Sequence, residues 1–230
     1  MARILLIETS TAQLSTALAE DGVVTAFRIC DEPRMQASLT APYVKEILDE
    51  KGLTVKDLDA VCVGRGPGSY TGLRVGVSTA KGLCFGAGLP LLAVGTLDAL
   101  VSEAHRLNVV PEGCRHIVPM VDARRMEVYT AVFTPDGRQL TETKPVIVDA
   151  DSFSAELACG PVLFIGDGAL KCREALTSEN ARFAAAFPTA MAMAPLAEAA
   201  WTEKRFEDVA YFEPFYLKDF VATVSRKKLF

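Results

Sequence analysis

One outline occurs twice along the 230 residues, and it restricts the fold more than any single motif does. The first copy is an apolar run, Arg3–Thr9, that carries Glu8 near its end and precedes two alternating segments joined by an Asp21-Gly22 turn. The second copy has an apolar run that reaches Asp122 and a turn at Pro135-Asp136-Gly137. The buried runs and hairpin arms are Arg3–Thr9 with Leu14–Glu20 and Val23–Cys30, then His116–Val121 with Met126–Thr134 and Arg138–Val148.

In each copy a helix and a second apolar strand follow, and that strand ends in glycines. The first ends in Gly64-Arg65-Gly66 and the second in Gly166-Asp167-Gly168. This order predicts an α/β fold with mixed sheets flanked by helices on both faces. Two copies predict two lobes with a cleft between them, an N-terminal lobe over residues 1–108 and a C-terminal lobe over residues 109–230. The alternative is that any α/β chain offers some self-similarity.

Composition excludes several classes of protein. The chain is 50% hydrophobic and 23% charged with a net charge of −5, which is typical of a globular protein and argues against a free-standing nucleic-acid binder. The six cysteines form no C-x-x-C pair, so we expect free thiols in a reducing compartment. The first apolar run reaches Glu8 too soon for a signal peptide, and Leu83–Val94 is too short for a bilayer. We therefore expect a cytoplasmic protein without a membrane segment.

The most informative motif is GRGPGSYTGLRVG, from Gly64 to Gly76. Its glycines predict a tight turn before a helix, whose N-terminal amides can hold an anion. It lacks the Gly-Lys-Ser/Thr of a Walker A loop and the spacing of a dinucleotide fingerprint. The alternative is a turn that needs positive φ and close packing. The residues predicted to face a nucleotide or anion are Glu8, Thr9, Ser10, Gly66, Gly68 and Asp122.

Those positions also have ordinary explanations. Hydroxyl groups after a strand often cap a turn, as Thr9 and Ser10 would. Asp122, followed by Arg124 and Arg125, would then belong to an internal ion pair.

A stripe of small residues follows the glycine motif, with Gly72, Gly76, Ala80, Cys84 and Gly88 recurring every four positions. Glycine destabilises a helix by about 1 kcal/mol relative to alanine, so another backbone should approach this side closely. That backbone belongs either to this chain or to a partner. A neighbouring helix over Ser38–Lys51 has its own apolar face. The predicted partner-interface residues are Val44, Ile47, Tyr70, Gly72, Leu73, Arg74, Gly76, Val77, Ala80 and Cys84.

Histidine and nucleophile patterns give no catalytic or metal site. His105 and His116 fit no common metal-ligand spacing, and G-x-S-x-G is absent. The last third predicts a helix around Thr189–Lys204 and a basic tail at Arg226–Lys228.

Four segments, ILLIETST, GRGPGSYTGLRVG, AKGL and VDARRMEVY, resemble the TsaB (YeaZ) family. The resemblance runs from Ile4 to Phe133 and more loosely through PFYL, Pro214–Leu217. It implies an actin-like ATPase (ASKHA) fold of two ribonuclease-H-like lobes. It also implies a bacterial protein of the machinery that makes threonylcarbamoyladenosine on tRNA, next to the anticodon.

The same resemblance implies that this chain is not the transferase. The catalytic paralogue, TsaD, carries a metal-binding His-x-x-x-His motif, and Thr96 and Leu100 stand at the matching positions here. The family pairs with TsaD through helices of its N-terminal lobe and is joined by TsaE, an ATPase. We therefore expect a scaffold subunit without a cofactor of its own, although weak nucleotide binding stays open. The complex would use ATP and contact tRNA, and the free chain would form a homodimer.

A second reading is a stand-alone actin-like ATPase or small-molecule kinase that uses Glu8, Thr9, Ser10 and the Gly66 turn on phosphates. A peptidase is disfavoured, because no nucleophile or metal site is visible in the sequence.

Overall fold

The first sheet forms around β1, whose continuous apolar sequence suits a strand that is buried on both faces. In the computed structural model, which describes residues 2–218, its strand order is β3-β2-β1-β4-β5. β1 is antiparallel to β2 and parallel to β4. The strands are β1 (Arg3–Glu8), β2 (Leu14–Glu20), β3 (Val23–Cys30), β4 (Ala60–Gly66) and β5 (Leu91–Gly95).

The second sheet repeats this arrangement, with the order β10-β9-β6-β7-β8. β6 occupies the place of β1, and β7, β8, β9 and β10 follow as β2, β3, β4 and β5 do. The predicted internal repeat is therefore confirmed, and chance self-similarity does not explain it. The strands are β6 (His116–Asp122), β7 (Glu127–Thr130), β8 (Lys144–Ile147), β9 (Val162–Ile165) and β10 (Ala181–Ala184).

The second hairpin is shorter than predicted. Its arms are Glu127–Thr130 and Lys144–Ile147, and beyond them the two segments are joined by an isolated bridge between Phe133 and Gln139 and by single backbone bonds such as Leu140 to Val132. Thr141 Oγ1 accepts a bond from the Val132 amide at 2.9 Å. The Val132 amide therefore bonds to a side chain and not to the backbone of the facing segment, which interrupts the ladder at this point.

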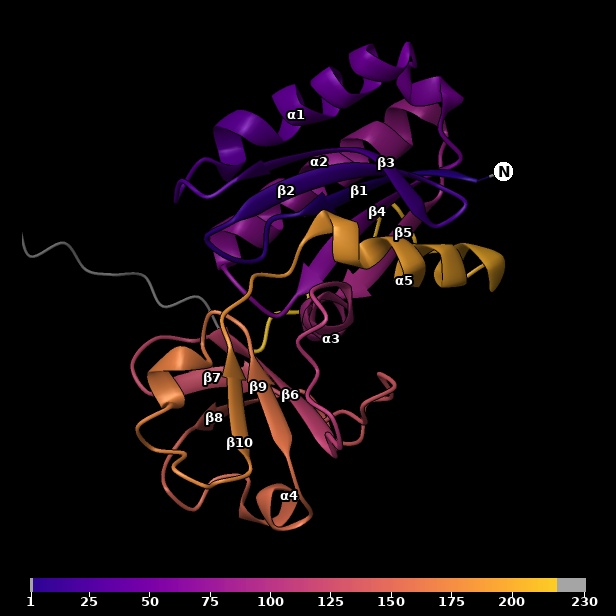
Figure 1. The fold of residues 1–230 in the computed structure, drawn as a ribbon. Coiled ribbons are helices and arrows are strands. Elements are labelled where there is room, and N and C mark those ends of the chain that lie inside the picture. Colours follow the sequence, from indigo (N-terminus) through magenta and orange to yellow (C-terminus); the bar gives the residue numbers. More distant parts are fainter. Residues whose placement is uncertain (1, 219–230) are drawn as a thin grey trace, which may run out of the picture.

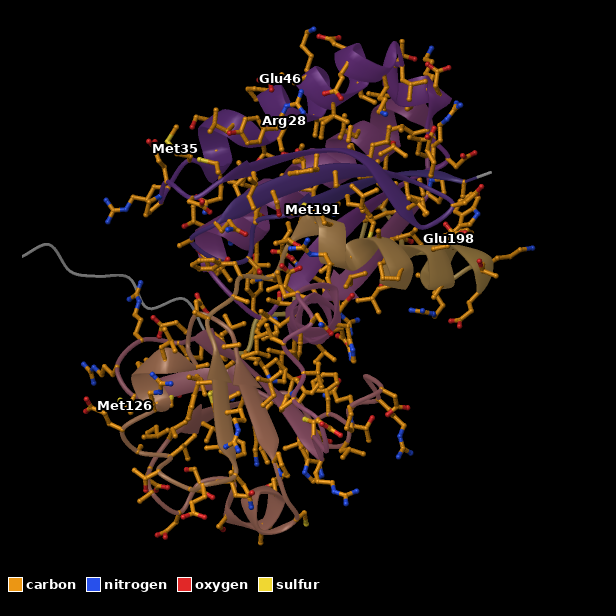
Figure 2. The ribbon with its side chains drawn as sticks, in the orientation of Figure 1. Arg28, Met35, Glu46, Met126, Met191 and Glu198 are labelled. Atoms are coloured by element: carbon orange, nitrogen blue, oxygen red, sulfur yellow. The ribbon has the colours of Figure 1, made fainter. Side chains whose placement is uncertain are left out.

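Helices cover both faces of the first sheet. α1 (Gln36–Lys51) and α2 (Tyr70–Ala87) lie on one face, α5 (Ala190–Thr202) lies on the other, and α3 (Thr96–Arg106) lies between the two sheets (Figure 1). Arg28 on β3 points toward α1 and donates to Glu46 at 2.9 Å (Figure 2). The remaining short elements are α4 (Ser154–Ala158) and two 3-10 turns, Val55–Asp57 and Leu170–Cys172. Among residues 2–218, no helix has both the length and the apolar character that crossing a bilayer requires.

Alternate side chains of β1 supply two separate cores. Leu5 and Ile7 pack toward α1 and α2, whereas Ile4 and Leu6 pack toward α5. The predicted division into residues 1–108 and 109–230 stays a prediction. By its packing, however, α5 is part of the first sheet's core, although it comes from the C-terminal half of the chain.

A buried polar cluster fixes the start of α5. The Thr189 hydroxyl accepts a bond from the Ala192 amide at 3.1 Å and donates to Glu103 of α3 at 2.8 Å. The Ala190 amide donates to Ser15 of β2 at 2.8 Å. The first sheet, α3 and α5 are therefore joined at one point.

Replacing Thr189 with Val should destabilise the protein by about 1–3 kcal/mol, because the α5 cap is lost and buried Glu103 loses a donor. Urea unfolding followed by circular dichroism measures the free energy of unfolding. Thr202→Val, at the exposed end of the same helix, is the control and should change it by less than about 0.5 kcal/mol. Equal losses in both variants would contradict the role of the cluster.

Candidate functional site

The turn after β1 is enclosed by the loop after β4 and by α2. Glu8, Thr9 and Ser10 are completely buried. Thr9 Oγ1 donates to the Gly72 carbonyl at 2.8 Å, and the Ser69 amide donates to the Ser10 carbonyl at 2.6 Å. Thr9 and Ser10, which were predicted to face a nucleotide, therefore face the first turn of α2.

Three glycines make this close approach possible. A Cβ atom added to Gly68, Gly72 or Gly76 would lie within 3.0 Å of atoms of Ser10 or Thr9. Real Cβ atoms essentially never show so short a separation. Of the two explanations left open by the sequence, packing within this chain accounts for Gly72 and Gly76.

The amides at the start of α2 are less available to an anion than predicted. Ser69 Oγ accepts a bond from the Gly72 amide, and the Ser69 carbonyl accepts one from Leu73. Gly66 is buried with a φ of 104° and packs against Leu73 and the Phe215 carbonyl. The expectation of open N–H groups in this loop is therefore wrong for Ser69, Gly72 and Leu73, because the protein itself supplies their acceptors.

The Glu8 carboxyl group lies beneath Gly64 with little compensation for its burial. Oε1 accepts a bond from the Ser10 amide at 2.6 Å, and Oε2 has no hydrogen-bond partner in the described part of the chain. Burial raises the pKa of Glu8 from 4.5 to about 7, and the bonds from Ser10 offset only part of this rise. The group is therefore protonated in the folded protein at mildly acidic pH.

Asp122 occupies the corresponding strand end in the second sheet but has a different environment. It is half exposed, accepts a bond from the Arg124 amide at 2.8 Å and forms an ion pair with Lys171. The predicted internal ion pair of Asp122 is therefore present, but its cation is Lys171 and not Arg124 or Arg125. Its own amide donates to Asp167 at 2.9 Å, and burial raises the pKa of Asp167. Asp167 was missed, although the glycines on either side of it in the repeat marked the same strand end.

Most of the predicted interface residues lie inside the chain. The two at the surface are Tyr70, which is partly exposed, and Arg74, which is exposed. The others are buried between α1, α2 and the first sheet, so they do not present a contact surface: Val44, Ile47, Gly72, Leu73, Gly76, Val77, Ala80 and Cys84. An interface on this helix pair would use the opposite side, and the assignment of these eight residues is corrected accordingly.

The outward side of α2 carries residues that sequence reasoning missed. Phe85 is 87% exposed, and it follows Arg74 and Ser78 along the exposed side of the helix. Helical periodicity opposite the glycine stripe would have found it. Tyr211, 83% exposed, lies beside this helix, because Lys81 Nζ donates to the carbonyl of Ala210 at 3.0 Å.

The segment of residues 205–218, named the strap below, runs from α5 along the first sheet. The Glu207 amide donates to Leu91 on β5 at 2.8 Å, and the Phe215 amide donates to Arg65 at 2.7 Å. The Tyr216 ring lies 4.9 Å from that of Tyr70, and Arg74 lies over Tyr70. Lys218 then pairs with Glu127 on β7, so the strap connects the glycine loop to the second sheet.

Gly72→Ala should destabilise the protein by about 2 kcal/mol, because the new methyl group would meet the Thr9 carbonyl. Gly82→Ala is the matched control, since nothing lies within 4 Å of its added Cβ and alanine favours the helix by about 1 kcal/mol. Thermal unfolding of both variants should therefore shift in opposite directions. Equal stabilisation would contradict the close approach.

Glu8→Gln should reduce the pH dependence of stability. Because the pKa is raised in the folded protein, wild-type stability falls as pH rises from about 4.5 through 7. A rise of about 2.5 pKa units corresponds to about 3 kcal/mol. The unfolding free energy is measured at pH 5 and at pH 8, and the difference between the two values should be smaller in the variant by about this amount. The same difference in both proteins would exclude a buried, protonated Glu8.

Comparison with known proteins places this arrangement in a family. The family model described as "TsaD: tRNA N6-adenosine threonylcarbamoyltransferase" matches residues 34–225. The tRNA threonylcarbamoyladenosine biosynthesis protein TsaB of Escherichia coli is 34% identical over 96% of each chain. The protein of the same name from Haemophilus influenzae is 30% identical over 98% of this chain and 96% of its own length.

Solved structures agree with the sequence relatives. YeaZ from Pseudomonas aeruginosa superposes with a TM-score of 0.81 and 28% identity, covering 94% of this chain and 100% of its own. Component A of the (R)-2-hydroxyglutaryl-CoA dehydratase of Acidaminococcus fermentans has a TM-score of 0.51 at 8% identity, over 89% of this chain and 100% of its own, which reports a shared fold alone. The two repeated sheets form the predicted actin-like ATPase (ASKHA) fold, and the chain belongs to the TsaB (YeaZ) family.

Proposed function

We propose that this protein is a non-catalytic subunit of tRNA threonylcarbamoyladenosine biosynthesis that pairs with a TsaD-type protein and is joined by a TsaE-type ATPase. The names of its relatives from Escherichia coli and Haemophilus influenzae support the pathway. The observation that carries the pairing is the outward side of α2, where Phe85 is 87% exposed on the same side of the helix as Arg74. Exposed aromatic and arginine side chains are typical anchors of protein interfaces.

The environment of α3 supports a role without chemistry. Thr96 and Leu100 stand where the family resemblance expects metal-ligating histidines in the catalytic paralogue, and both are fully buried. Leu100 packs with Ile117 and Ile165 between the sheets. Its apolar side chain contributes to the core and offers no lone pair to a metal.

The enclosure of the β1 turn argues against the stand-alone ATPase or kinase. A carboxylate that holds a metal ion must be reached by that ion, whereas Glu8 is buried beneath Gly64. Its tendency to stay protonated also weakens it as a cation ligand. We therefore propose that the chain holds no cofactor of its own and that ATP is used by its partners.

The same outward side of α2 offers a contact for a second copy, and we propose a homodimer when the partner is absent. Contact with tRNA would come through the complex. The basic tail at Arg226–Lys228 lies outside the described residues, and the cytoplasmic location stays a prediction.

Pairing should depend on Phe85. Phe85→Ser should weaken binding to the TsaD-type protein of the same organism by at least about tenfold, because an aromatic anchor contributes at least about 1–2 kcal/mol. Phe27→Ser, which changes another exposed phenylalanine on β3, is the matched control and should bind as the wild type does. Calorimetry with purified proteins gives the dissociation constants, and far-UV circular dichroism checks the fold.

Two results would overturn the proposal. Unchanged affinity in Phe85→Ser would exclude this side of α2 as the contact. ATP hydrolysis by the isolated chain, lost in Glu8→Gln, would favour the stand-alone ATPase.

A further inference from the structure

A cavity of about 510 Å³ lies along β10, at the edge of the second sheet, and the function above does not use it. In the first sheet the equivalent edge strand, β5, is covered by the strap through the bond from Glu207 to Leu91. Along β10, no described segment pairs with the outer edge in this way. The repeat therefore leaves an open space at β10 where the first sheet is closed.

The polar lining of the cavity is cationic. Arg173 and Arg182 line it together with the hydroxyl groups of Thr177 and Ser178, and none of the described lining residues is Asp or Glu. The chain as a whole carries a net charge of −5. A concave site lined by one sign of charge concentrates ions of the opposite sign, so this cavity should attract anions.

The arginines have donors available for such an anion. Arg182 Nη1 donates to the carbonyls of Glu179 at 2.6 Å and Ala181 at 3.0 Å, which fixes the guanidinium, while Nη2 and Nε have no partner within residues 2–218. The Arg173 guanidinium lies 5.7 Å from the centre of the Phe183 ring. Neither arginine forms an ion pair with a described carboxylate. Ser178 Oγ accepts a bond from the Asn180 amide, so its hydroxyl hydrogen is free to donate.

The rest of the lining is apolar. Leu163 and Leu176 are almost fully buried beneath it, and Val109 and Pro111 present apolar surface to it. A ligand that satisfies both parts carries an anionic group at one end and an apolar body at the other. We propose that this cavity binds a small organic phosphate, with the phosphate between Arg173 and Arg182 and an apolar ring against Val109 and Pro111. Guanidinium groups suit phosphate geometry, and the volume lies within the range of about 300–1,000 Å³ typical of small-molecule sites.

Phenyl phosphate tests the complete proposal, because it carries a phosphate and an apolar ring. Inorganic phosphate tests the anionic group alone, and benzyl alcohol tests the ring alone. Each is titrated into the ¹⁵N-labelled full chain at constant ionic strength, and amide shifts are followed by NMR. Phenyl phosphate should shift resonances of residues 176–184 and bind at least tenfold more tightly than either half. Equal binding of inorganic phosphate would reduce the cavity to a cationic surface patch, and no shift with phenyl phosphate would refute the site.

Variants separate this site from general electrostatics. Arg173→Met should weaken phenyl phosphate binding at least tenfold, whereas Arg138→Met, which removes an exposed arginine outside the cavity, should leave it unchanged. Arg182→Lys should retain part of the affinity that Arg182→Met loses, because the positive charge remains. Equal weakening by Arg173→Met and Arg138→Met would overturn the proposal. Pairing through α2 should be unaffected by all four changes, so this test does not depend on the proposed function.

Discussion

The contact between the turn after β1 and the first turns of α2 organises the first half of the molecule. Backbone atoms of Thr9 and Ser10 reach the helix because Gly68, Gly72 and Gly76 present no side chain. This approach gives partners to the Thr9 hydroxyl and the Ser10 carbonyl, and the preceding residue, Glu8, is buried beneath Gly64 of β4. The end of β1 therefore contains a buried carboxyl group with one unpartnered oxygen, which is unfavourable for stability.

The contact also decides what each side of α2 can do. Its inward side packs against the sheet, so only the outward side, with Phe85 and Arg74, is left for the proposed partner. The strap adds Tyr216 to the start of this outward surface and Tyr211 to its middle, because Lys81 holds the strap backbone against the helix. The exposed side of α2 and the enclosed turn after β1 are therefore two consequences of the same packing.

Much of the fold could be predicted, because strands and turns have local sequence signals. The same signals occur in the same order in both halves of the chain, which supported each assignment twice. The direction of the glycine stripe could not, since it depends on Thr9, which is distant in sequence and has no periodic relation to Gly72 and Gly76. The strap was also beyond sequence reasoning. It is held through the backbone amides of Glu207 and Phe215, which any residue but proline supplies. Asp167 was within reach, because the repeat marked its position.

The return of α5 to the first sheet has a consequence for synthesis of the chain. β1 to β5 leave the ribosome early, yet the side of the sheet that carries Ile4 and Leu6 stays uncovered until Met193 and Ala197 have also emerged. The first sheet is therefore fully covered only when most of the polypeptide has been translated. The N-terminal half expressed alone would expose one apolar face of the sheet and would be prone to aggregation. The two lobes share one strand order, but the core of the first lobe is complete only after the C-terminal half has been synthesised.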